Sequence, residues 1–165
     1  MAKKPQTPQT DPNNKSLAQN RRARHDYDIV ETYEAGVELF GSEVKSIREG
    51  AVQLRESFAR VDNGEVWLYG VNIPPYKNAT SFGAHETTRK RKLLLHKKQI
   101  VELAEATASG GETLVPLALV MRDGKVKCVI GIAKGRKTVD KRHAIAERDS
   151  KRDTDRELSR RSKGR

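Results

Sequence analysis

The segment GIAKGRKTVDKR, residues 131–142, concentrates positive charge where an apolar stretch of the chain ends. Two kinds of chemistry use such a segment: a glycine-rich loop binding a nucleotide phosphate, or a basic strap binding nucleic acid. A phosphate-binding P-loop needs four residues between its glycines, followed by Lys and then Ser or Thr. Here three residues separate Gly131 from Gly135, and Arg136 follows the second glycine. The spacing therefore favours polyanion binding by five cations, Lys134, Arg136, Lys137, Lys141 and Arg142.

Side chains suited to metal or covalent chemistry are few and scattered. The sequence contains no HExxH, GxSxG, CxxC or calcium-loop motif. The single cysteine, Cys128, excludes an intrachain disulfide and a thiolate zinc cluster, and its apolar surroundings predict a buried side chain on a strand. The four histidines, His25, His85, His96 and His143, have no partner at metal-ligand spacing. We therefore expect a binding protein without metal or cofactor rather than an enzyme.

Net charge is unevenly distributed along the chain. The 165 residues carry a formal net charge of +11. Residues 1–25 contribute +5 and residues 134–165 contribute +7, whereas residues 26–133 are nearly neutral at −1. No stretch approaches the roughly 20 apolar residues of a membrane span, and the N-terminus lacks the apolar core of a secretory signal. These patterns predict a cytoplasmic protein in which a nearly neutral body carries two basic arms for a polyanionic partner.

The middle of the chain reads as short strands with two short helices. The run YDIVETY alternates with period two, as a strand does. Turn residues predict one hairpin around Asp62-Asn63-Gly64 and another around Asp123-Gly124. Pro116 indicates an edge or a bulge in the second hairpin. Helical spacing in SEVKSIREG predicts about two turns, with Ser42 as the N-cap and Gly50 just after the end, and LHKKQIVELAEATA predicts the longest helix of the core.

These elements predict a mainly β fold with small helices, organised as an OB-like antiparallel β-barrel over residues 20–133. Closure into a barrel removes the exposed edges that an open sheet would leave. Residues 1–19 contain almost no side chain that could be buried, so we expect a disordered N-terminal arm. Residues 134–165 form a basic tail with few apolar residues. We expect it to be disordered alone and helical once a polyanion neutralises it, with Asp140 as N-cap.

Three basic clusters, residues 20–25, 89–92 and 134–142, interrupt or flank this neutral body. A single charge run is commonly a solvated face, but three clusters favour nucleic acid, because phosphate neutralisation releases counterions. No predicted helix resembles a DNA recognition helix, and small barrels offer curved faces and loops to structured or single-stranded RNA. The sequence therefore favours an RNA partner.

Sequence motifs spread from about Asn20 to Arg165 carry a family resemblance. They are NRRARHDY, ETYEAGVELFGSEVKSIREG, RKLLLH, TLVPLALV, KVKCVIGIAKGRK and DKR. In kind and order they resemble small protein B, the SsrA-binding protein family of bacteria. The resemblance implies an OB-like barrel that binds tmRNA, chiefly its tRNA-like domain. It further implies delivery of tmRNA to stalled 70S ribosomes, where the nascent chain is tagged for degradation and the ribosome is released.

The resemblance also implies which residues meet the tRNA-like domain. The carboxylate of Glu34 would accept hydrogen bonds from base N–H groups or the 2′-OH and could orient a neighbouring cation. Taken alone, Glu34 reads as a polar turn residue before Gly36, and Leu94 reads as a core residue. The predicted contact set is Glu34, Lys45, Arg48, Arg91, Lys92, Leu94 and His96.

For the tail, the resemblance implies a path through the decoding centre and mRNA channel of the small ribosomal subunit. The predicted set is Lys134, Gly135, Arg136, Lys137, Val139, Asp140, Lys141 and Arg142. Many family members have an aromatic residue or His before DKR, whereas this chain has Val139, which has no π-system to stack on a base. That difference leaves the stacking part of the contact open, and the electrostatic part stands.

Chemistry in this pathway would belong to partners, since the resemblance assigns aminoacylation to alanyl-tRNA synthetase and GTP hydrolysis to elongation factor Tu. Two alternatives remain open. One is a general RNA chaperone or ribosome-associated OB-fold module that uses the same basic arms without tmRNA specificity. The other is a small nucleotide-dependent enzyme, which the P-loop spacing disfavours.

Overall fold

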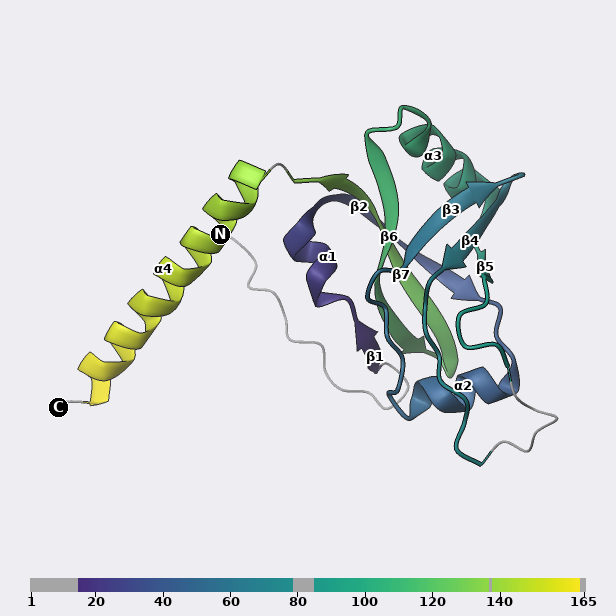
Figure 1. Ribbon diagram of the computed structural model, residues 1–165, viewed down its shortest axis with the longest axis horizontal. Coiled ribbons are helices and arrows are strands. Elements are labelled where there is room, and N and C mark those ends of the chain that lie inside the picture. Colours follow the sequence, from purple (N-terminus) through teal and green to yellow (C-terminus); the bar gives the residue numbers. More distant parts are fainter. Residues whose placement is uncertain (1–14, 79–84, 137, 164–165) are drawn as a thin grey trace.

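A computed structural model of the chain describes residues 15–78, 85–136 and 138–163 (Figure 1). Seven strands and four helices make up this part of the chain. The strands are β1 (Ser16–Gln19), β2 (Tyr27–Val37), β3 (Phe58–Asp62), β4 (Glu65–Tyr69), β5 (Arg91–Leu94), β6 (Glu112–Arg122) and β7 (Lys125–Gly135). The helices are α1 (Arg21–Asp26), α2 (Gly41–Arg48), α3 (Lys97–Ala108) and α4 (Thr138–Lys163).

The strands close into an antiparallel barrel. Pairing runs from β6 through β3, β4, β5, β2 and β7 and returns to β6. One edge of β6 pairs with β7 along its length, while the other edge is shared between β3 at Leu114 and β1 at Ala118 and Leu119. The predicted antiparallel barrel is therefore confirmed.

Both predicted hairpins are present, and the backbone angles of their turns explain the residue types found there. In the β3–β4 turn Asn63 and Gly64 have φ angles of 51° and 73°, and Asp123 and Gly124 in the β6–β7 turn have 48° and 74°. Positive φ at both central residues matches the right-handed twist of the strands, and these residue types adopt it readily. The irregularity predicted at Pro116 is also present, as a register shift between Pro116 and Ala118.

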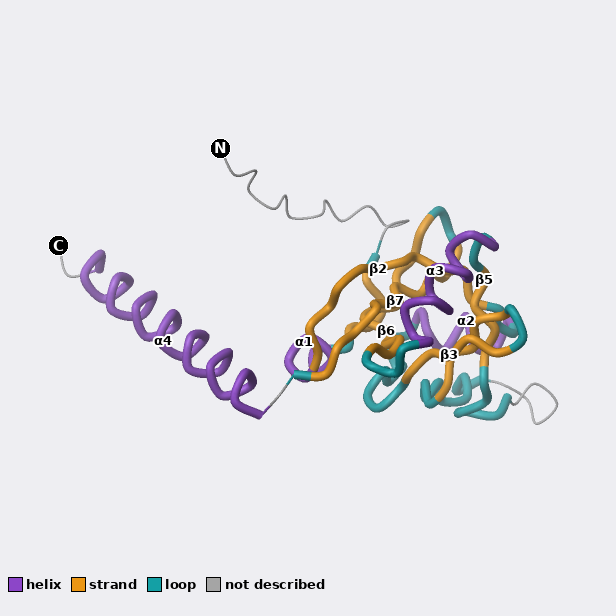
Figure 2. Tube along the Cα trace, turned by 90° about the horizontal axis from the view of Figure 1, so that it is seen from above, coloured by secondary structure: helices purple, strands orange, loops and turns teal. Residues whose placement is uncertain are grey.

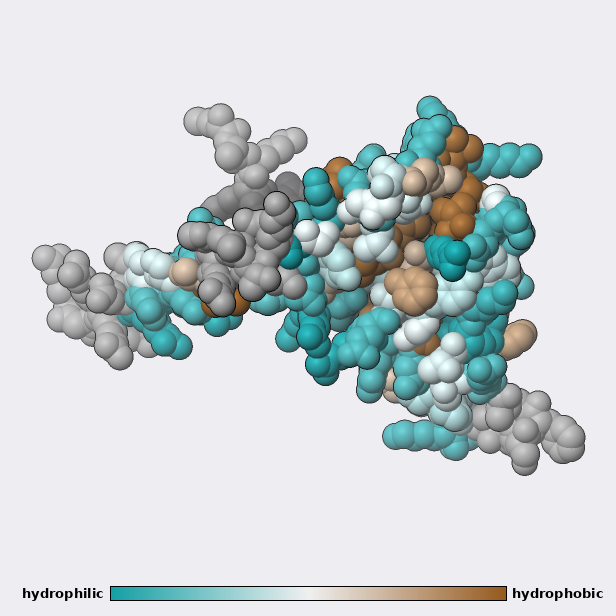
Figure 3. Space-filling view, turned by 45° about the horizontal axis from the view of Figure 1, so that its top comes forward, coloured by the Kyte–Doolittle hydropathy of each residue, from teal (hydrophilic) through white to brown (hydrophobic). Residues whose placement is uncertain are grey.

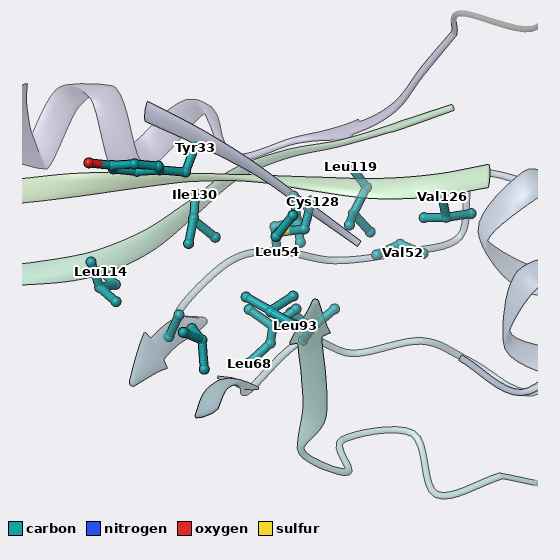
Figure 4. Close-up of a cluster of buried hydrophobic side chains, with 14 of the residues drawn as sticks. Tyr33, Val52, Leu54, Leu68, Leu93, Leu114, Leu119, Val126, Cys128 and Ile130 are labelled. Carbon is teal, nitrogen blue, oxygen red and sulfur yellow. The ribbon is translucent and has the colours of Figure 1, made fainter. Parts of the chain in front are cut away.

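Inward-facing side chains fill the barrel, and two helices cover its ends. Figure 4 shows Tyr33, Cys128 and Ile130 on the opposite side of the interior from Leu68 and Leu93. The helices α2 and α3 lie at opposite ends of the barrel and contribute the buried side chains Ile47 and Leu103 (Figure 1). Cys128 is fully buried as predicted, and burial raises the pKa of its thiol to about 12.

Four local predictions need correction. The N-terminal arm is not wholly irregular, because Ser16–Gln19 pair with β6 as β1; residues 1–14 lie outside the described residues. Residues 20–25 were predicted only as a basic cluster, and residues 21–26 form the helix α1. The helix α2 begins after Phe40, and the hydroxyl of Ser42, predicted as its N-cap, instead hydrogen-bonds with His85. Its end is as predicted, with Gly50 at φ 79° after the C-cap.

The fourth correction concerns the tail. The barrel extends two residues further than predicted, because Lys134 and Gly135 pair with Asp28 and Tyr27 as the end of β7. Thr138–Lys163 then form one helix, the state predicted for the tail on its polyanionic partner, while disorder of the isolated tail stays a prediction. Ala, Arg, Lys and Glu are strong helix formers, which favours this state. Because α4 begins at Thr138, Asp140 lies inside its first turn rather than at the N-cap.

Candidate nucleic-acid interface

A hollow on the outer surface of the barrel is centred on Gly36 of β2. In the sheet Gly36 stands between Leu94 of β5 on one side and Lys127 of β7 on the other. A Cβ atom added to Gly36 would lie 3.2 Å from the Cβ atom of Leu94. The missing side chain therefore leaves a depression between a hydrophobic residue and a cation.

The hollow belongs to a groove with an apolar floor and a basic rim. Its lining residues come from the end of β2, the start of α2, the end of β5 and the β6–β7 hairpin; they are Gly36, Val37, Leu39, Val44, Leu94, Gly124, Lys125, Val126 and Lys127. Leu94 is 53% exposed, which is unusual for a leucine beside a full core. Hydrophobic surface next to lysines suits a partner that offers both flat bases and phosphates.

Glu34 lies two residues before Gly36 on the same outward face of β2, because side chains alternate along a strand. It is exposed, and its Oε2 lies 3.4 Å from the Nε of Arg122, which ends β6. An exposed pair at this distance is weak and adds little stability. Glu34 therefore retains accepting capacity for a ligand, and Arg122 is the neighbouring cation that it can orient.

Two of the predicted cations, Lys45 and Arg48, are exposed on α2, the helix that supplies Val44 to the groove. The Nζ of Lys45 lies 5.6 Å from the ring centre of Tyr76, a cation–π contact that holds the lysine toward the loop after β4. Lys45 and Arg48 are therefore on the same helix as Val44, but neither lines the groove.

His96 and Lys92 flank Leu94 along the chain, and neither lines the groove. His96 is exposed and is the N-cap of α3, two residues beyond Leu94. Lys92 faces outward on β5, but its ammonium pairs with the carboxylate of Glu65, and this hydrogen bond raises the pKa of the lysine. Because Glu65 partly neutralises it, the ammonium of Lys92 would attract a phosphate less strongly than an unpaired lysine.

Arg91 does not lie on this surface, and its predicted RNA contact is wrong. The residue is fully buried. Its guanidinium lies 2.8 Å from Oε1 of Glu43 and donates to the carbonyl oxygens of Val71, Thr87 and Arg89. Alternation along β5 explains the location: Arg91 and Leu93 face inward, whereas Lys92 and Leu94 face outward.

Glu43 of α2 is the centre of this buried ion cluster. Its carboxylate receives hydrogen bonds from Arg89, Arg91 and the backbone N–H of Phe40, where α2 begins. Burial alone would raise the pKa of Glu43, but the bonds from Arg89 and Phe40 and the charge of Arg91 outweigh it and lower the pKa. The cluster fixes the start of α2 against β5, and so fixes two walls of the groove.

The base of the tail lies at the far end of β7. Lys134 and Gly135 are exposed there, while Arg136 returns to the barrel, with its Nε 2.6 Å from Asp28 and its backbone N–H bonded to the carbonyl oxygen of Asp26. Lys137 lies outside the described residues. Val139, Asp140, Lys141 and Arg142 lie on the first turns of α4.

The helix α4 extends away from the barrel in both views (Figures 1 and 2). Its described side chains from Ile145 to Arg156 are exposed. Figure 3 shows mainly hydrophilic residues along the described part of the tail. Apart from the buried Arg91, the predicted residues fall into two sets, one on β2, α2, β5 and the start of α3 and one at the base of α4.

Sequence reasoning missed three cations: Lys125 and Lys127, which line the groove, and Arg122, which pairs with Glu34. The alternation in KVKCVI carried the signal for the two lysines, because a buried Cys128 places Lys125 and Lys127 on the opposite face. Arg122 carries no such signal. Its approach to Glu34 depends on the pairing of β2, β7 and β6, which local sequence does not reveal.

Within the described ranges, no helix is long and apolar enough to cross a membrane. In the same part of the chain, no three His, Cys, Asp or Glu side chains gather as a metal site. The titratable residues that line the groove are the exposed Lys125 and the half-buried Lys127, and the exposed Glu34 lies two residues before Gly36.

Comparison with known proteins gives one consistent result. Residues 17–160 match the family model described as SmpB protein. The SsrA-binding protein of Frankia casuarinae is 53% identical over 149 residues, 90% of this chain and 93% of the relative, and that of Thermobifida fusca is 52% identical over 147 residues, 89% and 91%. A solved structure described as "tmRNA-SmpB: a journey to the center of the bacterial ribosome" is 45% identical, with a TM-score of 0.64 over 75% of this chain and 87% of that chain. The chain therefore belongs to the SmpB protein family.

Proposed function

We propose that this protein binds tmRNA through the Gly36 groove and carries it to stalled ribosomes, where trans-translation tags the nascent chain and releases the ribosome. Family membership supports the tmRNA partner, because the relatives are SsrA-binding proteins. The structural neighbour that combines tmRNA and SmpB with the bacterial ribosome supports the ribosomal setting.

The observation that carries the proposal is the convergence of Glu34 and Leu94 on one outward surface, although they are far apart in the sequence. Gly36 brings their strands together, since it pairs with Leu94 directly and follows Glu34 by two residues. Leu94 offers an apolar contact for a base or ribose, and Glu34 accepts hydrogen bonds from base N–H or the 2′-OH. The exposed side chains of Lys45, Arg48 and His96 would add attraction for phosphates and further polar contacts.

The tail has a separate role in this proposal. The helix α4 and its basic residues would follow the decoding centre and mRNA channel, where ribosomal RNA presents phosphates. Arg136 anchors the base of the tail to Asp28 of β2 and to the backbone of Asp26. Val139 offers no ring for stacking, so this contact is electrostatic.

The protein needs no catalytic group in this role. Aminoacylation of tmRNA would be the work of alanyl-tRNA synthetase, and GTP hydrolysis that of elongation factor Tu, both acting in the cytoplasm on the complex.

A truncation after Arg136 tests the division between groove and tail. This end point keeps all of β7 and the Arg136 contacts to Asp26 and Asp28. We expect the truncated protein to bind an RNA fragment of the tRNA-like domain within about threefold of the full chain, because the groove is intact. Peptide tagging on reconstituted stalled ribosomes should be lost. Lost RNA binding or retained tagging would refute the proposed division.

A second candidate, the general RNA chaperone, is distinguished by the RNA that the protein selects. Basic arms bind RNA without regard to sequence. We expect RNA recovered with the full-length protein from cells to be enriched in one tmRNA species, because the groove adds directed contacts to this attraction. Recovery of many RNAs at levels that follow their abundance would favour the chaperone.

A further inference from the structure

The outward face of the β3–β4 hairpin carries a row of aromatic side chains. Because side chains alternate along a strand, Phe58 on β3 and Trp67 and Tyr69 on β4 face outward, while their neighbours Ala59 and Leu68 are buried. The hairpin lies on the side of the barrel away from α4 (Figure 1). None of the three residues lines the Gly36 groove, and we call them the aromatic row.

Two of the three rings are stacked on each other. Phe58 and Tyr69 are register partners in the hairpin, and their ring centres lie 5.2 Å apart at an interplanar angle of 13°. Phe58 is nevertheless 45% exposed. A cross-strand aromatic pair stabilises a hairpin, so the pair has a structural role of its own. That role does not account for Trp67, whose register partners are Arg60 and Lys92.

The spacing of Trp67 and Tyr69 fits one flat group between their side chains. Residues two apart on a strand are separated by about 6.8 Å, and van der Waals contact between carbon atoms needs about 3.5–4.0 Å. A ring that enters between the two side chains therefore contacts both. The Nζ of Lys90 lies 4.7 Å from the ring centre of Trp67. Because Lys90 is exposed, its side chain can leave this ring without breaking a buried contact.

The charges around the aromatic row are largely paired with one another. Arg60 lies 3.3 Å from Asp62, and Lys92 pairs with Glu65. Lys90, over the ring of Trp67, is the third cation. Two carboxylates thus stand among three cations, and they oppose the approach of a polyanion. The aromatic row therefore suits an uncharged partner better than the phosphate backbone of a nucleic acid.

Trp67 also offers a hydrogen-bond donor to a partner. In the part of the chain that the structure describes, no group accepts a hydrogen bond from its indole N–H. A segment in the polyproline II conformation has no internal hydrogen bonds, so its carbonyl oxygens are free to accept one. Trp and Tyr combine a large apolar ring with a polar tip, which is why they are concentrated at protein interfaces.

We propose that the aromatic row binds an uncharged, proline-rich segment of a partner protein in the polyproline II conformation. A proline ring enters between Trp67 and Tyr69, with Phe58 stacked on Tyr69, and the indole N–H donates to a carbonyl oxygen of the segment. Such segments dock on aromatic surfaces with little loss of conformational entropy, because their conformation exists before binding. This inference does not rest on the proposed tmRNA binding, since the two surfaces share no residue.

Trp67 is the only tryptophan of the chain, so tryptophan fluorescence reports on this site alone. The full-length protein is titrated with a capped decaproline peptide, which contains no aromatic residue, and the tryptophan emission is recorded. A flexible Gly–Ser peptide of the same length is the control. We expect decaproline to change the emission in a saturable way below about 1 mM. The Gly–Ser peptide should cause no such change.

Phe58→Leu tests whether the aromatic row is the site, with Phe40→Leu as the matched control. Phe40 is 58% exposed and lies outside the row, so both variants lose one exposed ring. We expect Phe58→Leu and Tyr69→Leu each to weaken decaproline binding roughly tenfold, and Phe40→Leu to leave it within about twofold. Thermal melting verifies that each variant is folded. Phe58→Leu should still bind the tRNA-like-domain fragment as the unaltered protein does, which separates this test from that of the proposed function.

The inference is overturned if the unaltered protein shows no saturable change with decaproline up to that concentration. It is also overturned if Phe58→Leu and Tyr69→Leu, both folded, bind decaproline as tightly as Phe40→Leu does. A single-stranded oligouridine RNA, titrated in the same way, covers the opposite chemistry. If this RNA changes the emission of the unaltered protein but not that of Phe58→Leu, and decaproline changes neither, the row is a platform for bases and the inference is wrong.

Discussion

Two glutamates of this protein, Glu43 and Glu34, each pair with arginine, yet they differ in every other respect. Glu43 is fully buried, and its oxygens lie 2.8 Å from Arg91 and 2.7 Å from Arg89. Glu34 is exposed and lies 3.4 Å from the single cation Arg122. Desolvation makes the first pair costly to break, and water makes the second easy to exchange. Similar residue types thus serve the fold in one place and are available to a ligand in the other.

The difference explains how the two sites depend on each other. The Glu43 cluster holds the start of α2 and the strand β5, which supply Val44 and Leu94 to the groove. Glu34 is not part of this cluster; it lies on the outer surface whose shape the cluster stabilises. A substitution in the cluster should reduce stability first and binding only as a consequence, whereas a substitution at Glu34 should reduce binding alone.

The largest expected effect comes from breaking the buried cluster. Glu43→Gln leaves Arg91 buried without its counter-charge, and we expect a loss of about 3–5 kcal/mol in the free energy of unfolding. Urea denaturation followed by circular dichroism measures it. Glu34→Gln is the matched control and should change the same quantity by less than about 0.5 kcal/mol. If the two substitutions lowered the free energy of unfolding equally, the distinction between a structural Glu43 and a ligand-binding Glu34 would be wrong.

Two adjacent leucines provide the next test. Leu93→Ala removes a side chain that is 1% exposed and should cost about 2–5 kcal/mol of stability. Leu94→Ala removes one that is 53% exposed and should cost under about 1 kcal/mol while weakening binding to the tRNA-like domain. Denaturation and RNA titration of both variants check this. If Leu94→Ala destabilises the protein as much as Leu93→Ala does, Leu94 is a core residue.

A smaller effect is expected from acid. The folded protein holds the pKa of Glu43 below its ordinary value, so this carboxylate stabilises the fold above the unfolded pKa. That contribution is lost as the pH falls through the lowered pKa of the folded state. We expect the stability difference between the protein and Glu43→Gln to be full near neutral pH and to shrink below about pH 4. A difference that stays constant down to pH 3 would contradict the lowered pKa.

Local sequence rules predicted those parts of the fold that depend on neighbouring residues. Asn63-Gly64 and Asp123-Gly124 required positive φ and formed the expected turns. Gly50 ended α2 for the same reason. The strand β1 was missed because its four residues pair with β6, about a hundred positions away in the chain. Such pairing leaves no local pattern.

Alternation of side chains along a strand could have predicted which residues of β5 face the candidate site. If Leu94 faces RNA, period two places Lys92 on the same face and Arg91 in the core, so the error at Arg91 was avoidable. Recognition of Glu34 depended on the family resemblance, because the residue type alone fits an ordinary turn. The partnership of Glu34 with Arg122 follows only from the closed barrel.

The affinity of Glu34→Ala for a tRNA-like-domain fragment is the most direct test of the central claim, that the Gly36 groove is the tmRNA site. Loss of a charge-assisted acceptor should weaken binding by roughly tenfold or more. The salt slope should stay nearly unchanged, because Glu34 neutralises no phosphate. The unfolding midpoint should match that of the unaltered protein. A folded Glu34→Ala protein that binds the fragment with unchanged affinity at matched salt would contradict the claim.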